Sequence, residues 1–135
     1  MLVDVQVHDE GGWTIISVVG ELDLAVAPRI RHAAAEALGP ARRGPTPPQV
    51  VLDLGSVHFI DSSGLGIVFG VLRRVRQAAG ALRVVVTEPQ VLALFELLQL
   101  GAVLDVRPSV ADALAAPVLV APAAEGPVPA GGPGG

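Results

Sequence analysis

The strongest constraint on the fold is an aliphatic run, 50–54, followed closely by an amphipathic helical pattern. The run is continuous except for Asp53, which is typical of a strand covered on both faces. Over 63–79, apolar residues recur at helical spacing and arginines occupy the other side. A strand buried on both faces needs a helical layer next to it, so the pair predicts an α/β fold with parallel strands.

The remaining segments extend this alternation of strands and helices. Gly11-Gly12 marks a turn that joins the first two strands into a hairpin. The predicted order is β-β-α-β-α-β-α-β-α, which gives a single mixed, mostly parallel sheet with the first strand at its edge and about four helices. The further strands are expected at 2–8, 13–19, 82–86 and 103–106, and the further helices at 25–38, 89–100 and 109–115.

The last 20 residues differ in composition from the rest of the chain. Five of them are Pro, five are Gly, and Glu125 is the only charged residue. Such a segment buries too little apolar surface to offset its ordering entropy. We therefore predict a folded domain over 1–115 and a disordered tail over 116–135. The Pro-rich loop 39–49 has no assigned role.

Composition excludes several functional classes. Among 135 residues there are 9 arginines and no lysine against 13 acidic residues, for a net charge of -4, which disfavours a nucleic-acid binder. The absence of Cys and Lys excludes thiolate and lysine chemistry. The three His show no metal-ligand spacing, so we expect neither a metal nor a cofactor. No apolar run reaches the roughly 20 residues of a membrane span, and a signal peptide pattern is missing. The expected location is the cytoplasm.

The segment 60–66, Ile-Asp-Ser-Ser-Gly-Leu-Gly, concentrates the functional signal. It joins the end of a buried strand to the start of a helix, which is where open α/β sheets place their sites. The side chains of Asp61, Ser62 and Ser63 are good helix N-caps. Gly64 and Gly66 are expected to let the backbone approach neighbouring elements closely.

Together with its surroundings, this segment resembles the signature of bacterial anti-sigma factor antagonists, members of the STAS domain family. The matching stretches are 51–54 with 59–66, then 20–24 (Gly-Glu-Leu-Asp-Leu), and 89–104. The resemblance covers about residues 3–115. It implies a non-catalytic protein in a partner-switching cycle.

In that cycle, the resemblance implies that the unphosphorylated chain binds an anti-sigma factor that is also a serine kinase and so frees a sigma factor. The kinase then phosphorylates Ser62, and a serine phosphatase reverses the modification. We expect the phosphate to prevent binding by local repulsion and desolvation without unfolding the helix. Ser63 is either a further cap or a secondary phosphorylation site. The partner-binding residues expected from the resemblance are Glu21, Asp23, Asp61, Ser62, Ser63, Gly64 and Leu65.

Other functions use the same residues. A serine hydrolase would need Ser62 or Ser63 with His58, yet neither serine lies in a Gly-x-Ser-x-Gly elbow. A nucleotide site would use Gly64, Gly66 and Gly70, whose spacing departs from the dinucleotide fingerprint. A STAS accessory subunit of a lipid-transport or stress-signalling assembly is the closer alternative.

The helix expected at 89–100 carries more apolar residues than one buried stripe requires. It is either deeply buried or exposes a patch for a partner or a weak homodimer. Both interpretations stay open from the sequence.

Overall fold

The computed structural model describes residues 4–39 and 46–115. The loop residues 40–45 and the predicted tail, 116–135, lie outside this part. In chain order the elements are β1 (Asp4–Glu10), β2 (Trp13–Leu22), the short 3-10 helix η1 (Leu24–Val26), α1 (Ala27–Ala37), β3 (Gln49–Ile60), α2 (Ser62–Gln77), β4 (Ala81–Val85), α3 (Pro89–Leu97), η2 (Leu100–Ala102), β5 (Asp105–Arg107) and α4 (Val110–Ala115).

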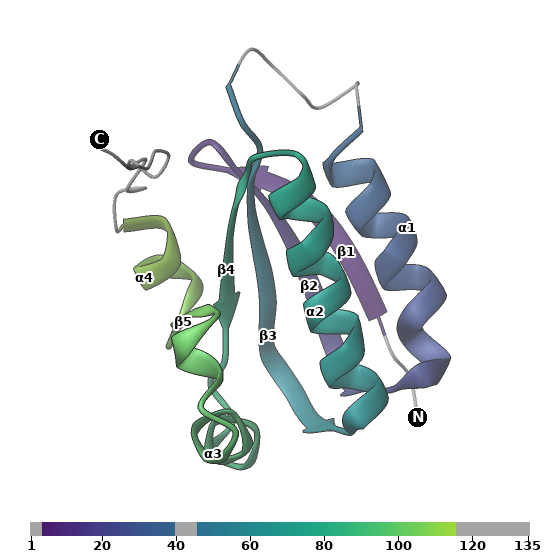
Figure 1. Cartoon of the computed structure of the whole chain (residues 1–135), viewed down its shortest axis with the longest axis vertical. Helices are drawn as coiled ribbons and strands as arrows, with labels where there is room; N and C mark the ends of the chain where they lie inside the picture. Colours follow the sequence, from purple (N-terminus) through teal and green to yellow (C-terminus); the bar gives the residue numbers. More distant parts are fainter. Residues whose placement is uncertain (1–3, 40–45, 116–135) are drawn as a thin grey trace, which may run out of the picture.

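The five strands form one sheet in the order β1-β2-β3-β4-β5 (Figure 1). β1 pairs antiparallel with β2 through the turn at Gly11-Gly12, and every other neighbouring pair is parallel. β1 lies at one edge of the sheet. The predicted α/β class, element order and edge hairpin are confirmed.

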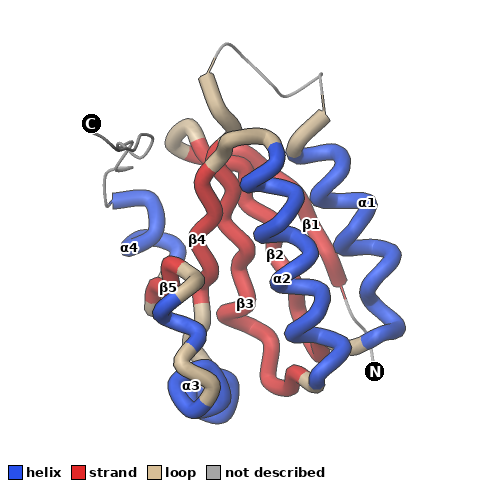
Figure 2. The backbone as a smooth tube through the Cα atoms, viewed as in Figure 1, coloured by secondary structure: helices blue, strands red, loops and turns tan. Residues whose placement is uncertain are grey.

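Helices cover the two faces of the sheet unequally (Figure 2). The larger core joins α1, α2 and α3 to one face and includes fully buried Ile30, Leu52 and Val68. A smaller core on the opposite face brings Ala113 of α4 against Ile15 and other strand residues. β3 is therefore covered on both faces, as its aliphatic run predicts, and each fully buried Val, Leu or Ile contributes roughly 1.5–3 kcal/mol to folding.

The strand predicted at 50–54 is longer than expected. β3 continues to Ile60 because its second half pairs with the end of β2. The pairing register shifts between Ser17 and Val19 and again between Gly20 and Glu21. Such bulges bend a strand while keeping it paired, so the broken apolar pattern after residue 54 concealed a continuing strand.

Several predicted boundaries are wrong by a few residues. The predicted helix 25–38 is divided: a 3-10 turn precedes α1, whose first turn contains Pro28. α3 ends at Leu97, and Gln99 then adopts a left-handed conformation with φ 55°. The last strand occupies 105–107 instead of 103–106, and β1 extends to Glu10.

The end of α2 differs from its predicted form. The pattern over 63–79 extends the predicted helix to Ala79, but α2 ends at Gln77 and Ala79 is left-handed, with φ 58°. Gly80 allows its backbone to lie close to that of Pro48, since a Cβ there would lie 2.4 Å from the carbonyl oxygen of Pro48.

The apolar residues of 89–100 are not all buried. Leu97 is 78% exposed, so part of the apolar surface of this segment faces outward.

Candidate functional site

The predicted site residues gather where β2 and β3 end side by side. In the parallel register Glu21 pairs with Phe59 and Leu22 pairs with Ile60. The chain then enters η1 through Asp23 and α2 through Asp61. The β2–η1 and β3–α2 connections therefore form one surface at the carboxyl edge of the sheet, the position expected for a site in this fold class.

Asp61 is the N-cap of α2. Its backbone is extended, at φ -109° and ψ -173°, and its Oδ1 accepts a hydrogen bond from the amide of Gly64 at 2.8 Å. The Asp61 carbonyl accepts the amide of Leu65 at 2.9 Å. The side-chain contact satisfies the amide of Gly64, one of those that a helix start leaves without partners, and the carbonyl contact is the first regular hydrogen bond of α2. The predicted capping role of Asp61 is confirmed.

Gly64 fixes the start of α2 against the end of β2. A Cβ at this position would lie 2.1 Å from the carbonyl oxygen of Leu22 and 2.7 Å from Cγ1 of Ile60. Only glycine permits this approach. The same prediction for Gly66 is wrong, because a Cβ there would have nothing within 4 Å.

Unlike the side chain of Asp61, the side chains of the two serines do not cap the helix. Ser62 is the first residue of α2 and is exposed, and Ser63 is half-buried. Within the described residues, neither hydroxyl makes a hydrogen bond. The interpretation of Ser63 as a cap is wrong, since Asp61 already holds that position. The Ser62 hydroxyl is presented to solvent on a fixed backbone.

The acidic residues from the β2 end are held by separate contacts. Asp23 caps η1, with its Oδ1 accepting the amide of Ala25 at 3.0 Å. Glu21 Oε2 lies 3.8 Å from His58 Nε2, so His58 borders this surface and contacts Glu21. Glu21, Asp23 and Asp61 all belong to this edge of the sheet, and each of the three is half-buried.

Apolar side chains at this edge were missed in the sequence. Leu24 is 71% exposed and Phe59 49% exposed, while Leu65, a predicted contact residue, is half-buried. Exposed large apolar groups beside polar ones are typical of interaction surfaces. The signal was available, because Phe59 is a large apolar residue directly before the predicted site segment 60–66.

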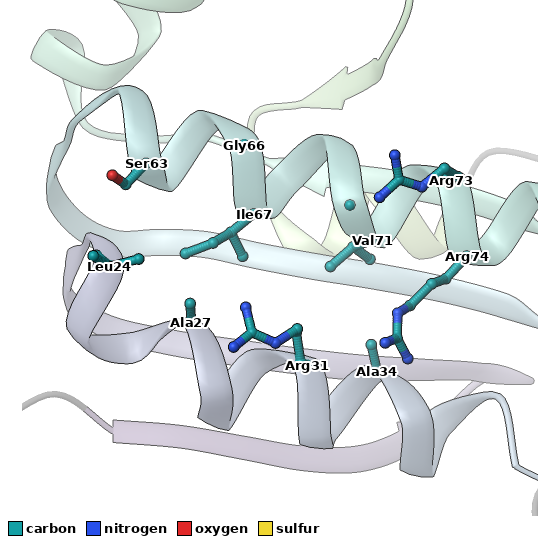
Figure 3. Close-up of a pocket in the computed structure, with 11 residues that line it drawn as sticks. Leu24, Ala27, Arg31, Ala34, Ser63, Gly66, Ile67, Val71, Arg73 and Arg74 are labelled. Atoms are coloured by element: carbon teal, nitrogen blue, oxygen red, sulfur yellow. The ribbon is translucent and has the colours of Figure 1, made fainter.

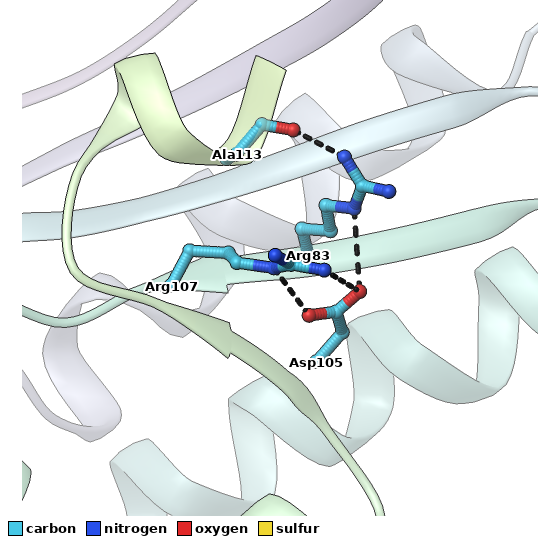
Figure 4. A network of polar contacts seen from close by, with 4 residues as sticks. All are labelled: Arg83, Asp105, Arg107 and Ala113. Atoms are coloured by element: carbon cyan, nitrogen blue, oxygen red, sulfur yellow. Dashed lines mark hydrogen bonds and ion pairs between the residues drawn. The ribbon is translucent and has the colours of Figure 1, made fainter. Parts of the chain in front are cut away.

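A second polar centre, also missed, lies beneath α4 (Figure 4). Arg83 in β4 is only 4% exposed. Its Nε lies 3.2 Å from Oδ2 of Asp105, its Nη1 donates to the carbonyl of Ala113, and its guanidinium carbon lies 4.7 Å from the ring centre of Trp13. Arg107 donates to the same carboxylate at 2.7 Å, and this bond raises the pKa of Arg107 above its ordinary value. A charged residue inside the run 82–86 was the available signal.

Asp53 lies on the same face of the sheet as Arg83 and makes local contacts there. Its Oδ1 accepts the amide of Gly55 at 2.9 Å, and its Oδ2 lies 3.5 Å from Oγ of Ser17.

Over residues 4–39 and 46–115, no group of three or more His, Asp or Glu could hold a metal ion. Within the same ranges, no helix has the length and apolarity needed to cross a bilayer.

Comparison with known proteins identifies the family of this chain. The family model described as the STAS domain matches residues 3–113. The chain belongs to the STAS domain family. This STAS chain is 28% identical to the anti-sigma F factor antagonist of Paenibacillus polymyxa over 114 residues, which are 84% of the chain and 94% of that relative.

Solved structures of anti-sigma factor antagonists share the fold. An anti-sigma factor antagonist from Mycobacterium paratuberculosis superposes with a TM-score of 0.70 at 28% identity, covering 84% of this chain and 92% of the other. The anti-sigma factor antagonist SpoIIAA in its unphosphorylated form gives a TM-score of 0.60 at 20% identity, covering 82% and 93%. The phosphorylated form of SpoIIAA from Bacillus also gives 0.60, at 22% identity, covering 82% and 96%.

Proposed function

We propose that this STAS protein is an anti-sigma factor antagonist that acts by partner switching in the cytoplasm. Its unphosphorylated form binds an anti-sigma factor that is also a serine kinase, and so frees a sigma factor. Phosphorylation of Ser62 by that kinase ends the binding, and a serine phosphatase restores it. The similarity to antagonists of the same family supports this role.

The observation that carries the proposal is the exposure of Ser62 at the first position of α2. Its hydroxyl has no hydrogen bond to the described residues, while Asp61 and Gly64 hold the backbone beneath it. A kinase must reach a serine hydroxyl without unfolding the substrate. Ser62 meets that requirement, whereas Ser63 is half-buried and is the secondary candidate.

The chain acts as the substrate of this chemistry and does not catalyse it. A nucleophilic serine needs a base within hydrogen-bond reach. His58, the histidine that borders the site, contacts Glu21 instead. Binding then depends on the surface formed by Glu21, Asp23, Asp61, Ser62, Ser63, Gly64 and Leu65.

Phosphorylation would change the charge of this surface far more than its shape. A phosphate adds about -1.5 to -2 charges at neutral pH, next to the carboxylates of Glu21, Asp23 and Asp61. At a helix N-terminus that charge is tolerated by the fold. In SpoIIAA, the phosphorylated and unphosphorylated forms match this chain equally, at a TM-score of 0.60. We propose that the switch acts on the partner interface, where a neutral hydroxyl would be replaced by a dianion.

Substitution of Ser62 tests the proposal. Ser62→Asp should weaken binding to the cognate anti-sigma factor at least about tenfold, since a charge facing an interface built for a neutral group costs several kcal/mol. Ser62→Ala should bind like the wild type. Ser56→Asp, at an exposed serine of β3, is the matched control and should change affinity less than about threefold. Equal affinities for Ser62→Asp and the wild type in calorimetric titrations would contradict the switch.

A further inference from the structure

A groove of about 330 Å³ lies between α1 and α2 and extends away from the serine site. Leu24 and Ser63 lie at one end and Arg74 at the other (Figure 3). Its α2 wall includes Gly66 and Gly70, and a Cβ at either glycine would have nothing within 4 Å. The glycines therefore leave open space where other residues would place side chains.

The groove is positively charged in a chain whose net charge is -4. Arg31 of α1 and Arg74 of α2 extend into the space between the helices, and Arg73 adds to the lining (Figure 3). Among the described residues that line the groove none is a carboxylate, and α2 contains no acidic residue. Within the described residues, none of these three arginines makes an ion pair or a side-chain hydrogen bond. Their charges are available to an external anion.

The dimensions of the groove favour a polypeptide over a small anion. The span from Ser63 to Arg74 along α2 is 11 residues, or roughly 16 Å at 1.5 Å per residue. A compact phosphate would contact only one end. A segment carrying both apolar and acidic side chains would cover the small-residue walls and pair with the guanidinium groups, which favour carboxylates in bidentate geometry.

We propose that the α1–α2 groove docks an acidic, partly apolar segment of the protein partner, with Arg31 and Arg74 as its recognition residues. This inference rests on the proposed function, because the partner is the anti-sigma factor. It adds a contact region beyond the surface around Ser62. Since Ser63 lines the near end of the groove, the docked segment would end beside the serine pair.

Matched charge reversals on one helix test the groove. Arg74→Glu, in the groove, should weaken binding to the anti-sigma factor at least about tenfold, because it replaces an attractive contact with a repulsive one. Arg31→Glu on the facing helix should reproduce this loss. Arg76→Glu makes the same charge change on α2 but lines a different hollow, and it should cost less than about threefold. Thermal melts monitored by circular dichroism confirm folding, and Arg31→Gln with Arg74→Gln replaces any variant that fails to fold.

The possible failures are distinguishable. Equal losses of affinity for Arg74→Glu and Arg76→Glu would show general electrostatic attraction and overturn the proposed docking in the groove. Wild-type affinity of Arg74→Glu would overturn it as well. If the wild type binds no anti-sigma factor, the proposed function fails, and the groove is tested separately by NMR. A short peptide of alternating Glu and Leu should then shift amide signals of α1 and α2 in the wild type but not in Arg74→Glu. Shifts with inorganic phosphate or ATP and none with the peptide would identify a small-anion site and overturn the proposal.

Discussion

Two polar regions of this STAS protein differ in whether their key polar group is buried and paired or exposed and without a partner among the described residues. Around Arg83, every described charge is engaged: the guanidinium is 4% exposed and contacts Asp105, Ala113 and Trp13. At the start of α2, the backbone is equally well fixed, but the Ser62 hydroxyl is exposed and has no partner in the described structure. The first region uses polar groups to attach α4 to the sheet. The second uses them to fix the backbone, while the Ser62 hydroxyl stays exposed.

This contrast separates rigidity from burial. Asp61, Gly64 and the carbonyl of Leu22 define the backbone at Ser62 without covering the serine itself. A substrate site for a kinase needs that combination, because a fixed hydroxyl lowers the entropy lost on binding. Substitutions in the two regions should therefore affect different measurable properties.

The largest expected effect is at the backbone of the serine site. Gly64→Ala should lower the free energy of unfolding by about 4 kcal/mol, because its Cβ would meet the backbone carbonyl of Leu22, which cannot rotate away. Gly66→Ala is the matched control on the same helix. With open space around its Cβ, it should leave stability unchanged or raise it by up to about 1 kcal/mol. Urea denaturation measures both, and similar values for the two variants would contradict the proposed role of the Gly64 contact.

The next effect is expected in the buried region. Arg83→Ala should destabilise the fold by about 3 kcal/mol, at the lower end for a broken buried pair because Asp105 retains access to water. Arg107→Ala removes a donor to the same carboxylate from a more exposed position, so it should cost less than about 1 kcal/mol. Neither variant should alter binding to the anti-sigma factor when both proteins are folded. A loss of affinity in folded Arg83→Ala would break the separation between the two regions.

The smallest stability effect is expected at the cap. Asp61→Ala removes the acceptor for the Gly64 amide and should cost about 1 kcal/mol of unfolding free energy. Asp61→Asn keeps an acceptor oxygen and should remain within about 0.5 kcal/mol of the wild type. Chemical denaturation provides the comparison. Equal stability of Asp61→Ala and the wild type would mean that the cap does not hold this surface.

Local patterns predicted most of the fold, because hydrophobic periodicity and turn residues report short-range structure. They identified the edge hairpin, the strand covered on both faces and the position of Asp61 as a cap. They could not separate Gly64 from Gly66, since the difference depends on Leu22, which is remote in sequence and adjacent only after β2 and β3 pair. Arg83 shows the same limit: Asp105 and Ala113 lie 22 and 30 residues away.

The groove between α1 and α2 also required the fold. Arg31 and Arg74 belong to helices separated by a whole strand, and each alone looks like an ordinary solvated arginine on a helical surface. That both line one groove, with no carboxylate among its described lining residues, appears only when the two helices pack together. The serine pair, by contrast, was visible locally because strand, cap and helix are contiguous in the sequence.

The central claim is that Ser62 is the regulatory phosphorylation site on a fold that does not change. The most direct measurement is incubation of the full chain with its cognate anti-sigma kinase and ATP, followed by tandem mass spectrometry to locate the phosphate. We predict phosphate on Ser62 and loss of binding by the modified protein, with its circular dichroism spectrum unchanged. Phosphate located only at other residues, or a protein phosphorylated on Ser62 that still binds its partner with full affinity, would contradict the claim.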